Sequence, residues 1–169
     1  MAMDIQLRSI HKGDQENVQR MFTEFNASEF GKYDPIENTD EAHVLAFLEN
    51  MMQNHVIYAI TASDSEEMIG YICFHIVGEE YDIGYMLLTE HQGAGIATAA
   101  LRIAMKKVSE ERRVKLFTAT VAAENAPSVR VLEKLNFSLV SEKYIEKEEN
   151  GMTYRITERR YEKHVSDGI

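Results

Sequence analysis

The sequence predicts an α/β (α+β) fold, a single domain over residues 1–169 in which a mixed sheet of about seven strands combines with about four helices. Two patterns carry this prediction. Three strand-like segments follow one another with short polar connectors, which is typical of an antiparallel meander. A strand, a helix and a second strand come next, and this order makes the two strands parallel neighbours. A sheet with both kinds of pairing is mixed.

The first third of the chain predicts one strand and two helices. Residues 3–10 alternate apolar and polar side chains, as a half-buried strand does. A helix is predicted from Asp14, which is a helix start signal followed by apolar residues at helical spacing. Residues 27–40 contain a glycine, a proline and several acids and are predicted to be a loop. A second helical pattern covers residues 40–54.

The central segments supply the meander and its crossover. Strands are predicted at residues 56–62, 67–77 and 80–88, and a helix at residues 95–113. A strand at 114–121 and a helix at 125–137 complete the crossover region. The apolar stripe predicted for the 95–113 helix consists of Ile96, Ala99, Ala100, Ile103 and Val108.

The chain ends in a predicted hairpin. Two alternating segments, residues 139–148 and 152–162, flank the dipeptide Asn150-Gly151. These two residue types suit the positive φ angles of a type I′ turn, so the two strands are predicted to pair directly.

The composition is that of an ordinary globular protein, with 44% hydrophobic and 27% charged residues and a formal net charge of −10. The negative charge argues against nucleic acid as a partner. No apolar stretch approaches the length of a membrane span, so no membrane association is expected. The N-terminal residues lack the pattern of a secretory signal, and a cytoplasmic location is the expectation.

Two residue types are assigned no chemistry. The single cysteine, Cys73, lies in an apolar, strand-like run and is expected to be a buried small hydrophobe. The histidines lack the spacing of metal ligands, so no metal is expected; they include His43, His55, His75 and His91.

A glycine-rich segment after the third meander strand predicts an anion site. Small residues at Gly93, Ala94, Gly95 and Ala97 allow a phosphate group to approach the backbone at the start of the following helix, where free N–H groups point at one place. A tight strand-to-helix turn is the alternative interpretation. The segment lacks the third small residue of a dinucleotide fingerprint, which argues against a dinucleotide site, and it lacks the Gly-Lys-Ser/Thr of a P-loop, which excludes that site.

The six residues Gln92-Gly93-Ala94-Gly95-Ile96-Ala97 resemble the Q/R-x-x-G-x-G/A motif of the GNAT superfamily of acyl-coenzyme A-dependent N-acyltransferases. Further stretches, "YDIGYMLLTEHQGAGIATAALR" and "NAPSVRVLEKLNF", are similar to its ribosomal-protein N-acetyltransferase-like branch. At motif level the resemblance covers residues 81–137, and the predicted order of elements is similar to that of the family. Asn136 stands where the family usually has glycine, and it suits the left-handed conformation expected there.

The resemblance implies acetyl-coenzyme A as co-substrate and assigns residues to it. Backbone amides of Gln92, Gly93, Ala94, Gly95, Ile96 and Ala97, with Thr98 close by, would bind the pyrophosphate. Main-chain groups of Met86, Leu87 and Leu88, where the strand before the loop diverges from the next parallel strand, would bind the pantetheine arm. Asn125 would hydrogen-bond the pantetheine, act as a helix N-cap, or do both.

The resemblance also assigns the catalytic groups. A carboxylate must take a proton from the acceptor amine before attack, and Asp82 stands where the family often has a glutamate, with Glu80 on the same strand face as second choice. Leu132 occupies the place of the usual tyrosine general acid. Ser128 matches a serine thought to assist the departing thiolate, and a plain serine at a helix start is the alternative.

The predicted function is transfer of an acetyl group from acetyl-coenzyme A to a primary amine of a small molecule or of a protein or peptide N-terminus, by direct attack in a ternary complex. A catalytically silent coenzyme A-binding or regulatory module is the alternative. A homodimer is compatible with the resemblance. The first two helices and their loop carry acids that suit a cationic acceptor or form a solvated surface, namely Glu24, Glu29, Asp34, Glu37, Asp40 and Glu41.

Overall fold

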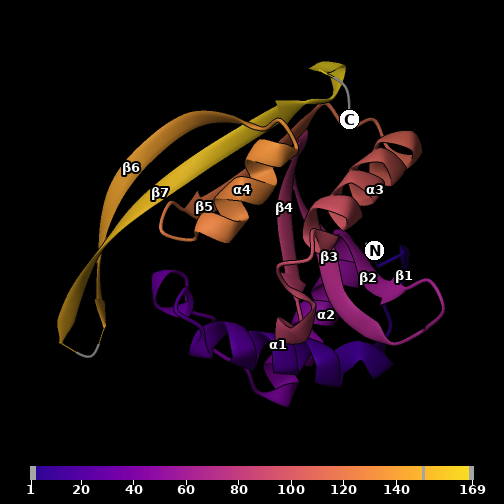
Figure 1. The fold of residues 1–169 in the computed structure, drawn as a ribbon, viewed down its shortest axis with the longest axis horizontal. Coiled ribbons are helices and arrows are strands. Elements are labelled where there is room, and N and C mark those ends of the chain that lie inside the picture. The colour runs from indigo at the N-terminus through magenta and orange to yellow at the C-terminus, as the bar shows by residue number, and fades with distance from the viewer. Residues whose placement is uncertain (1–2, 150, 168–169) are drawn as a thin grey trace.

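The computed structural model describes residues 3–149 and 151–167 and contains one seven-stranded sheet in the order β1-β2-β3-β4-β5-β7-β6 (Figure 1). The predicted mixed sheet is confirmed. The strands are β1 (Ile5–Ser9), β2 (Val56–Ala62), β3 (Met68–Val77), β4 (Glu80–Leu87), β5 (Leu116–Ala122), β6 (Ser138–Glu149) and β7 (Met152–His164). The helices are α1 (Gln15–Ala27), α2 (Glu41–Asn54), α3 (Ile96–Glu111) and α4 (Ala126–Lys134), with short 3₁₀ turns η1 (Lys12–Asp14), η2 (Gly31–Tyr33), η3 (Thr89–His91) and η4 (Val165–Asp167).

The meander and the crossover are also confirmed. Strands β1 to β4 pair antiparallel in sequence order, and β4 pairs parallel with β5. The short connectors between the meander strands leave no room for a crossover, whereas α3 carries the chain from the end of β4 back to the start of β5.

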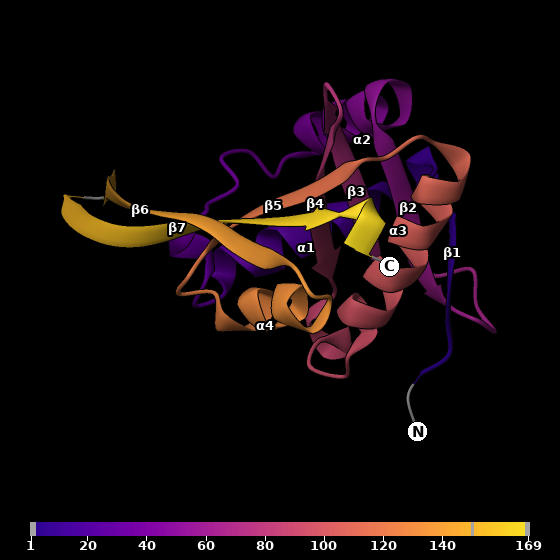
Figure 2. The same ribbon diagram turned by 90° about the horizontal axis from the view of Figure 1, so that it is seen from above.

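Helices cover both faces of the sheet, with α1 and α2 on one side and α3 and α4 on the other (Figures 1 and 2). The alternation of side chains along β3 explains the two layers. Tyr71 and Cys73 belong to the apolar cluster shared with α1 and α2, and Ile72 and Phe74 belong to the cluster shared with α3. Cys73 is 2% exposed, as predicted, and burial raises the pKa of its thiol to about 12.

The buried face of α3 differs from the predicted stripe. Ile96, Ala100 and Val108 are buried as expected, but Ala99 is exposed and Ile103 is 43% exposed. The buried positions instead include Leu101, Ala104 and Met105. The helix therefore lies rotated on the sheet relative to the prediction, because the larger side chains Leu101 and Met105 fill the core. No helix in the described part of the chain is long and apolar enough to span a membrane.

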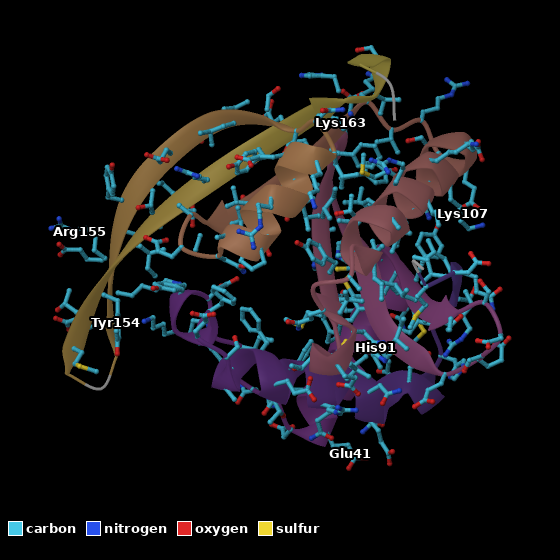
Figure 3. The ribbon with its side chains drawn as sticks, in the orientation of Figure 1. Glu41, His91, Lys107, Tyr154, Arg155 and Lys163 are labelled. Carbon is cyan, nitrogen blue, oxygen red and sulfur yellow. The ribbon has the colours of Figure 1, made fainter. Side chains whose placement is uncertain are left out.

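The last two strands form a long curved arm that extends beyond the sheet (Figure 1). Tyr154 and Arg155 lie toward its far end and Lys163 lies near the body of the molecule (Figure 3). The predicted hairpin pairing is confirmed, but β7 and not β6 lies beside β5. Gly151 has φ of 75°, as its part of the predicted turn requires, whereas Asn150 lies outside the described residues.

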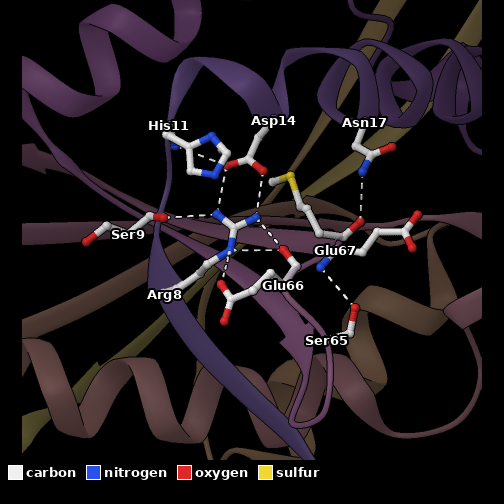
Figure 4. Close-up of polar contacts among 9 residues, drawn as sticks. Arg8, Ser9, His11, Asp14, Asn17, Ser65, Glu66 and Glu67 are labelled. Carbon is white, nitrogen blue, oxygen red and sulfur yellow. Dashed lines mark hydrogen bonds and ion pairs between the residues drawn. The ribbon is translucent and has the colours of Figure 1, made fainter.

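A buried ion pair fixes the start of the chain (Figure 4). The Arg8 guanidinium donates to both carboxylate oxygens of Asp14, at 2.9 and 2.7 Å, and also to the Glu66 carbonyl at 2.9 Å. The amide of His11 donates to Asp14 as well, at 3.0 Å. These contacts connect β1, η1 and the turn between β2 and β3.

Candidate active site

The two parallel strands of the sheet part from each other in the middle of the molecule. β4 and β5 pair only at Glu80 with Leu116, Tyr81 with Phe117, and Asp82 with Thr118. Beyond Asp82, β4 stays paired with β3, and beyond Thr118, β5 continues along β7. One edge of β4 is therefore free of a strand partner from Ile83 onward, so its main chain is open to another molecule.

The hydrogen-bond alternation along β4 identifies which residues face this opening. The Leu88 amide donates to the Ile69 carbonyl at 2.9 Å. Since neighbouring residues of a strand direct their backbone groups to opposite sides, Met86 also faces β3, and Leu87 and Tyr85 face the opening. Of the three main-chain positions predicted here, only Leu87 faces it. Its carbonyl accepts a 3.1 Å hydrogen bond from the Gln92 side chain, which links the strand end to the following loop.

The loop after η3 presents unsatisfied backbone donors. Gly93 and Gly95 have φ of 78° and 77°, a conformation that glycine adopts without strain. Gly95 is the N-cap of α3, and no side chain caps the helix. Within the described residues, none of the amides of residues 93–98 donates a hydrogen bond to a protein acceptor. Six consecutive free donors at a helix N-terminus are suited to bind an anion.

The start of α4 lies on the other side of the opening. The Asn125 side chain accepts a 3.3 Å hydrogen bond from the Ser128 amide, so the N-cap interpretation of Asn125 is confirmed. Its amide nitrogen remains available to a ligand. The Ser128 hydroxyl accepts a 3.1 Å hydrogen bond from the Tyr85 hydroxyl. Tyr85 was not predicted as a site residue from the sequence. The only local indication of its role is its position on β4, two residues before Leu87.

The two candidate bases have different surroundings. Asp82 lines the cavity between the helices, and the Thr118 hydroxyl donates to its Oδ1 at 2.9 Å. Burial raises the pKa of the Asp82 carboxyl above its ordinary value, although the Thr118 hydrogen bond opposes this shift. Glu80 accepts a 3.0 Å hydrogen bond from Arg160 and is not among the lining residues. Asp82 is therefore the acid whose place and protonation suit a general base.

His75 lies next to Asp82 across the β3–β4 ladder and also lines the cavity. Burial lowers the pKa of His75, and the neighbouring His55, whose ring centroid is 5.1 Å away, lowers it further. The charge of Asp82 opposes this shift and favours a proton on His75, so the two side chains stabilise each other's charged forms across the ladder.

These groups surround one cavity of about 770 Å³. It extends from the glycine loop and Ser128 to the segment between α1 and α2, and Leu132 lines it at the place of the missing tyrosine. Of the six acids predicted for an acceptor site, Glu24, Glu29 and Asp34 line it, whereas the other three do not. Aromatic rings lie beside them, namely Phe25, Phe30, Tyr33, Phe47 and Tyr71.

Glu24 is already bound to the protein itself. Its carboxylate accepts hydrogen bonds from the Thr89 amide at 2.9 Å and hydroxyl at 2.7 Å, and from Arg20 at 2.7 Å. It thereby joins α1 to η3. Glu29 and Asp34 are exposed, and no ion pair involves them within the described residues. The basic residues of α3 lie on a solvated face, where Lys107 pairs with Glu111 at 3.0 Å (Figure 3).

Comparison with known proteins assigns the family. Residues 4–138 match the family model described as "Acetyltransferase (GNAT) domain", so the chain belongs to the GNAT acetyltransferase family. A curated relative, the uncharacterized N-acetyltransferase YnaD of Bacillus subtilis (strain 168), is 30% identical over 107 residues. That alignment spans 62% of this chain and 63% of the relative.

Solved structures share the fold over nearly the whole chain. A GNAT-family acetyltransferase from Bacillus anthracis is 24% identical with a TM-score of 0.77 and covers 98% of both chains. A spermidine N-acetyltransferase from Vibrio cholerae, in complex with CoA and spermine, has 19% identity, a TM-score of 0.78 and 96% coverage of both chains. The ribosomal-protein-S5-alanine acetyltransferase of Vibrio fischeri has 18% identity and a TM-score of 0.75, covering 96% of this chain and 94% of its own.

Proposed function

We propose that the chain transfers an acetyl group from acetyl-coenzyme A to a primary amine, on a small molecule or on a protein or peptide N-terminus, by direct attack in a ternary complex. The observation that carries this proposal is the parting of β4 and β5 directly after Asp82 and Thr118. It opens the main chain of β4 between an anion site at one end and a half-buried carboxylate at the other, around one cavity.

The residues present fit acetyl-coenzyme A. The free amides of residues 93–98 match the charge and the acceptor oxygens of a pyrophosphate. The open edge of β4 at Tyr85 and Leu87, together with the free amide nitrogen of Asn125, suits the amide groups of a pantetheine arm. When bound, acetyl-coenzyme A would supply the activated acetyl group.

The proposed chemistry assigns one task to each polar group of the cavity. Asp82 accepts a proton from the ammonium form of the acceptor, directly or through water, because its raised pKa makes it a stronger base than an exposed carboxylate. The Ser128 hydroxyl donates a hydrogen bond to the sulfur as it departs. Glu80, which is paired with Arg160, has a structural role in this scheme.

The acceptor is proposed to be cationic. Glu29 and Asp34 line the cavity, and neither is neutralised by an ion pair with a described residue. The aromatic rings that line the same cavity offer faces to a cation or to an alkyl chain. An amine with a second positive charge fits this lining.

Release of free thiol from acetyl-coenzyme A in the presence of a panel of amines tests the proposal, with coenzyme A binding measured by calorimetry on the same protein. Turnover with at least one amine is expected. Binding without turnover on any amine would support the second candidate, a silent coenzyme A-binding module, which Leu132 in the place of the usual tyrosine favours. Absence of binding would contradict both.

A further inference from the structure

The Tyr85 side chain bridges the two walls of the opening. Its hydroxyl lies 3.1 Å from the Ser128 hydroxyl, although 43 residues separate the two in sequence. Tyr85 belongs to β4, and Ser128 belongs to α4, which packs on β5. The contact therefore joins the two strands that part after Asp82, and both side chains line the cavity.

The direction of this hydrogen bond determines where the Ser128 proton points. The 3.1 Å distance between the two oxygens fits either hydroxyl as donor, and the Ser128 proton is free when Tyr85 donates and Ser128 accepts. A serine hydroxyl accepts and donates at the same time, so the Ser128 proton remains free for another acceptor. In the described parts of the chain the Ser128 hydroxyl donates to no other group. The hydrogen bond from Ser128 to Asn125 is made by the backbone amide and does not use the hydroxyl proton.

We propose that Tyr85 is a positioning residue that holds the Ser128 hydroxyl with its proton directed at the sulfur of coenzyme A. This inference rests on the proposed function. During transfer the amine nitrogen forms a bond to the acetyl carbonyl carbon, the carbon–sulfur bond breaks, and the sulfur leaves with the electron pair. Asp82 accepts the proton that the ammonium form of the acceptor loses before attack and returns it to solvent, and it then accepts the second proton, which the nitrogen loses after attack. The Ser128 hydrogen bond stabilises the thiolate until solvent protonates it. Nothing is oxidised or reduced.

The surroundings of Tyr85 support hydrogen bonding and not proton release. Burial raises the pKa of the Tyr85 hydroxyl above its ordinary value, and the Ser128 contact opposes this only in part. Tyr85 therefore stays protonated over the neutral range and acts as a permanent donor. Two hydroxyls in series polarise each other, so the Ser128 O–H becomes a stronger donor than an isolated serine.

This arrangement also accounts for Leu132. The side chain at that position has no donor, and it is 2% exposed in the apolar core. The tyrosine hydroxyl that positions Ser128 comes from β4, on the facing wall of the cavity, and not from position 132 in the next turn of α4. Because Ser128 lies in the first turn of α4, the positive end of that helix adds to the stabilisation of a thiolate.

Titration of the coenzyme A thiol in the binary complex tests the inference without an acceptor. The ultraviolet absorbance of the thiolate is measured against pH, and the complex with desulfo-coenzyme A serves as blank for tyrosine ionisation. The only cysteine does not interfere, because the pKa of Cys73 is about 12. The charged groups Arg130, Lys134 and Asp82 line the same cavity and are present in every variant, so the thiol pKa of each variant is compared with that of the native complex.

The variant Tyr85→Phe keeps the ring and removes the hydroxyl. We expect the thiol pKa of bound coenzyme A to lie below that of free coenzyme A in the native complex and to rise by roughly one unit in Tyr85→Phe. Ser128→Ala should give a rise at least as large, and the double variant should add little to it. Tyr81→Phe is the matched control, since Tyr81 lies on the same strand and in the core, and it should titrate as the native complex does.

Each outcome decides the inference. The inference would be overturned if coenzyme A bound to folded Tyr85→Phe had the same thiol pKa as in the native complex. It would also be overturned if the thiol in the native complex had the same pKa as in free coenzyme A. Tyr85→Phe could melt at a lower temperature and bind no coenzyme A, so that its effect on the thiol pKa cannot be compared with that of the double variant. Ser128→Ala alone then decides, and an unchanged thiol pKa in that variant overturns the inference. Failure of the native protein to bind coenzyme A in calorimetry would remove the proposed function itself, which separates the two failures.

With an identified amine, kinetics provide a second measurement. Tyr85→Phe should lower kcat about tenfold, the value of one lost hydrogen bond, and leave the KM for acetyl-coenzyme A unchanged. A purely structural contact between β4 and α4 would instead change the KM, or would change nothing.

Discussion

The Thr118 hydroxyl donates a 2.9 Å hydrogen bond to the Asp82 carboxylate at the last position where β4 and β5 still pair. The carboxylate is thereby held at the mouth of the opening, with its second oxygen left for the cavity. The neighbouring strand thus orients the short side chain of an aspartate at the position where the family resemblance implies a longer glutamate.

The first prediction concerns Asp82 as the base. Asp82→Asn keeps the size and the acceptor for Thr118 but cannot take a proton, so turnover at neutral pH should fall about a hundredfold or more. In the native enzyme kcat should decline as the pH falls through the raised pKa of Asp82, and this acidic limb should vanish in the variant. A pH profile of kcat for both proteins measures it, and unchanged turnover in Asp82→Asn would remove Asp82 as base.

The same variant should be more stable than the native protein. A carboxyl whose pKa is raised on folding destabilises the folded state once it is ionised, that is, as the pH rises through the folded pKa. The melting temperature of Asp82→Asn should therefore exceed that of the native protein at neutral pH, and the difference should disappear below the ordinary carboxyl pKa. A lower melting temperature at neutral pH would show that the charge stabilises the fold.

The second prediction concerns the glycine loop. At Gly95 a methyl group meets no atom within 4 Å, so Gly95→Ala meets backbone strain at φ of 77° but no clash within the protein. We expect it to cost about 1–2 kcal/mol of stability and to weaken coenzyme A binding at least about tenfold, because the methyl group occupies the approach to the free amides. Calorimetry with coenzyme A measures the binding.

Gly78→Ala is the matched control for this change. Gly78 also has a positive φ, 63°, and open space around its Cβ, but it lies in the turn between β3 and β4 and does not line the cavity. It should lose comparable stability and keep full affinity for coenzyme A. Equal affinity losses in both variants would indicate a general effect of destabilisation and contradict the anion site.

Local patterns were sufficient for the meander, the crossover and the helix starts, whereas α3 and α4 end two and three residues before their predicted ends. Short connectors permit only antiparallel neighbours, and the β-α-β order permits only a parallel pair, so the sequence determines these relations directly. Likewise Asn125 caps α4, and Asn136 adopts the predicted positive φ, 59°. Each of these features depends on residues within a few positions of one another.

Relations between distant segments could not be predicted in this way. Ile103 and Leu101 lie on different faces of α3, and only the shape of the sheet below decides which face is buried. Both hairpin strands alternate equally well, so the sequence did not show that β7 lies beside β5. The partner of Glu80 is Arg160, 80 residues later in the chain, and no local spacing reveals it.

The third prediction concerns the ion pair between Arg8 and Asp14, whose side chains are 17% and 5% exposed. Asp14→Asn removes the nearer of the two carboxylates that pair with Arg8, while Glu66 remains at 3.7 Å, and should lower the free energy of unfolding by about 2 kcal/mol, measured by urea titration. Burial alone would raise the pKa of Asp14, but hydrogen bonds from Arg8 and the His11 amide hold it below its ordinary value.

The pH dependence of that contribution follows from the lowered pKa. A carboxyl with a depressed pKa stabilises the folded state above its unfolded pKa, and the contribution is lost as the pH falls through the folded pKa. The difference between native protein and Asp14→Asn should therefore shrink in acid. Glu49→Gln, which removes the exposed pair with Lys12, is the control and should leave unfolding unchanged at every pH. A pH-independent difference for Asp14→Asn would contradict the assignment.

The fourth prediction separates a cationic acceptor site from a solvated loop. Glu29 and Asp34 are exposed and line the cavity, so neutralising both, in Glu29→Gln with Asp34→Asn, should not affect folding. The KM for a diamine should rise about tenfold, because each of the two carboxylates contributes about 0.7 kcal/mol of attraction near a protein surface. The KM for a monoamine without a second charge and the KM for acetyl-coenzyme A should stay constant.

Glu37→Gln is the control for this double variant, since Glu37 lies in the same segment, is exposed and does not line the cavity. It changes the net charge of the protein without changing the lining, so it should leave the KM for the diamine constant. Added salt should raise the native KM for the diamine and have less effect on the double variant, because screening acts on the interaction that the variant lacks. If Glu37→Gln raised the KM for the diamine as much as the double variant does, or if the double variant raised the KM for the monoamine equally, the acids would act only through the net charge of the protein. The acceptor would then be selected by the aromatic rings and Asp82 alone.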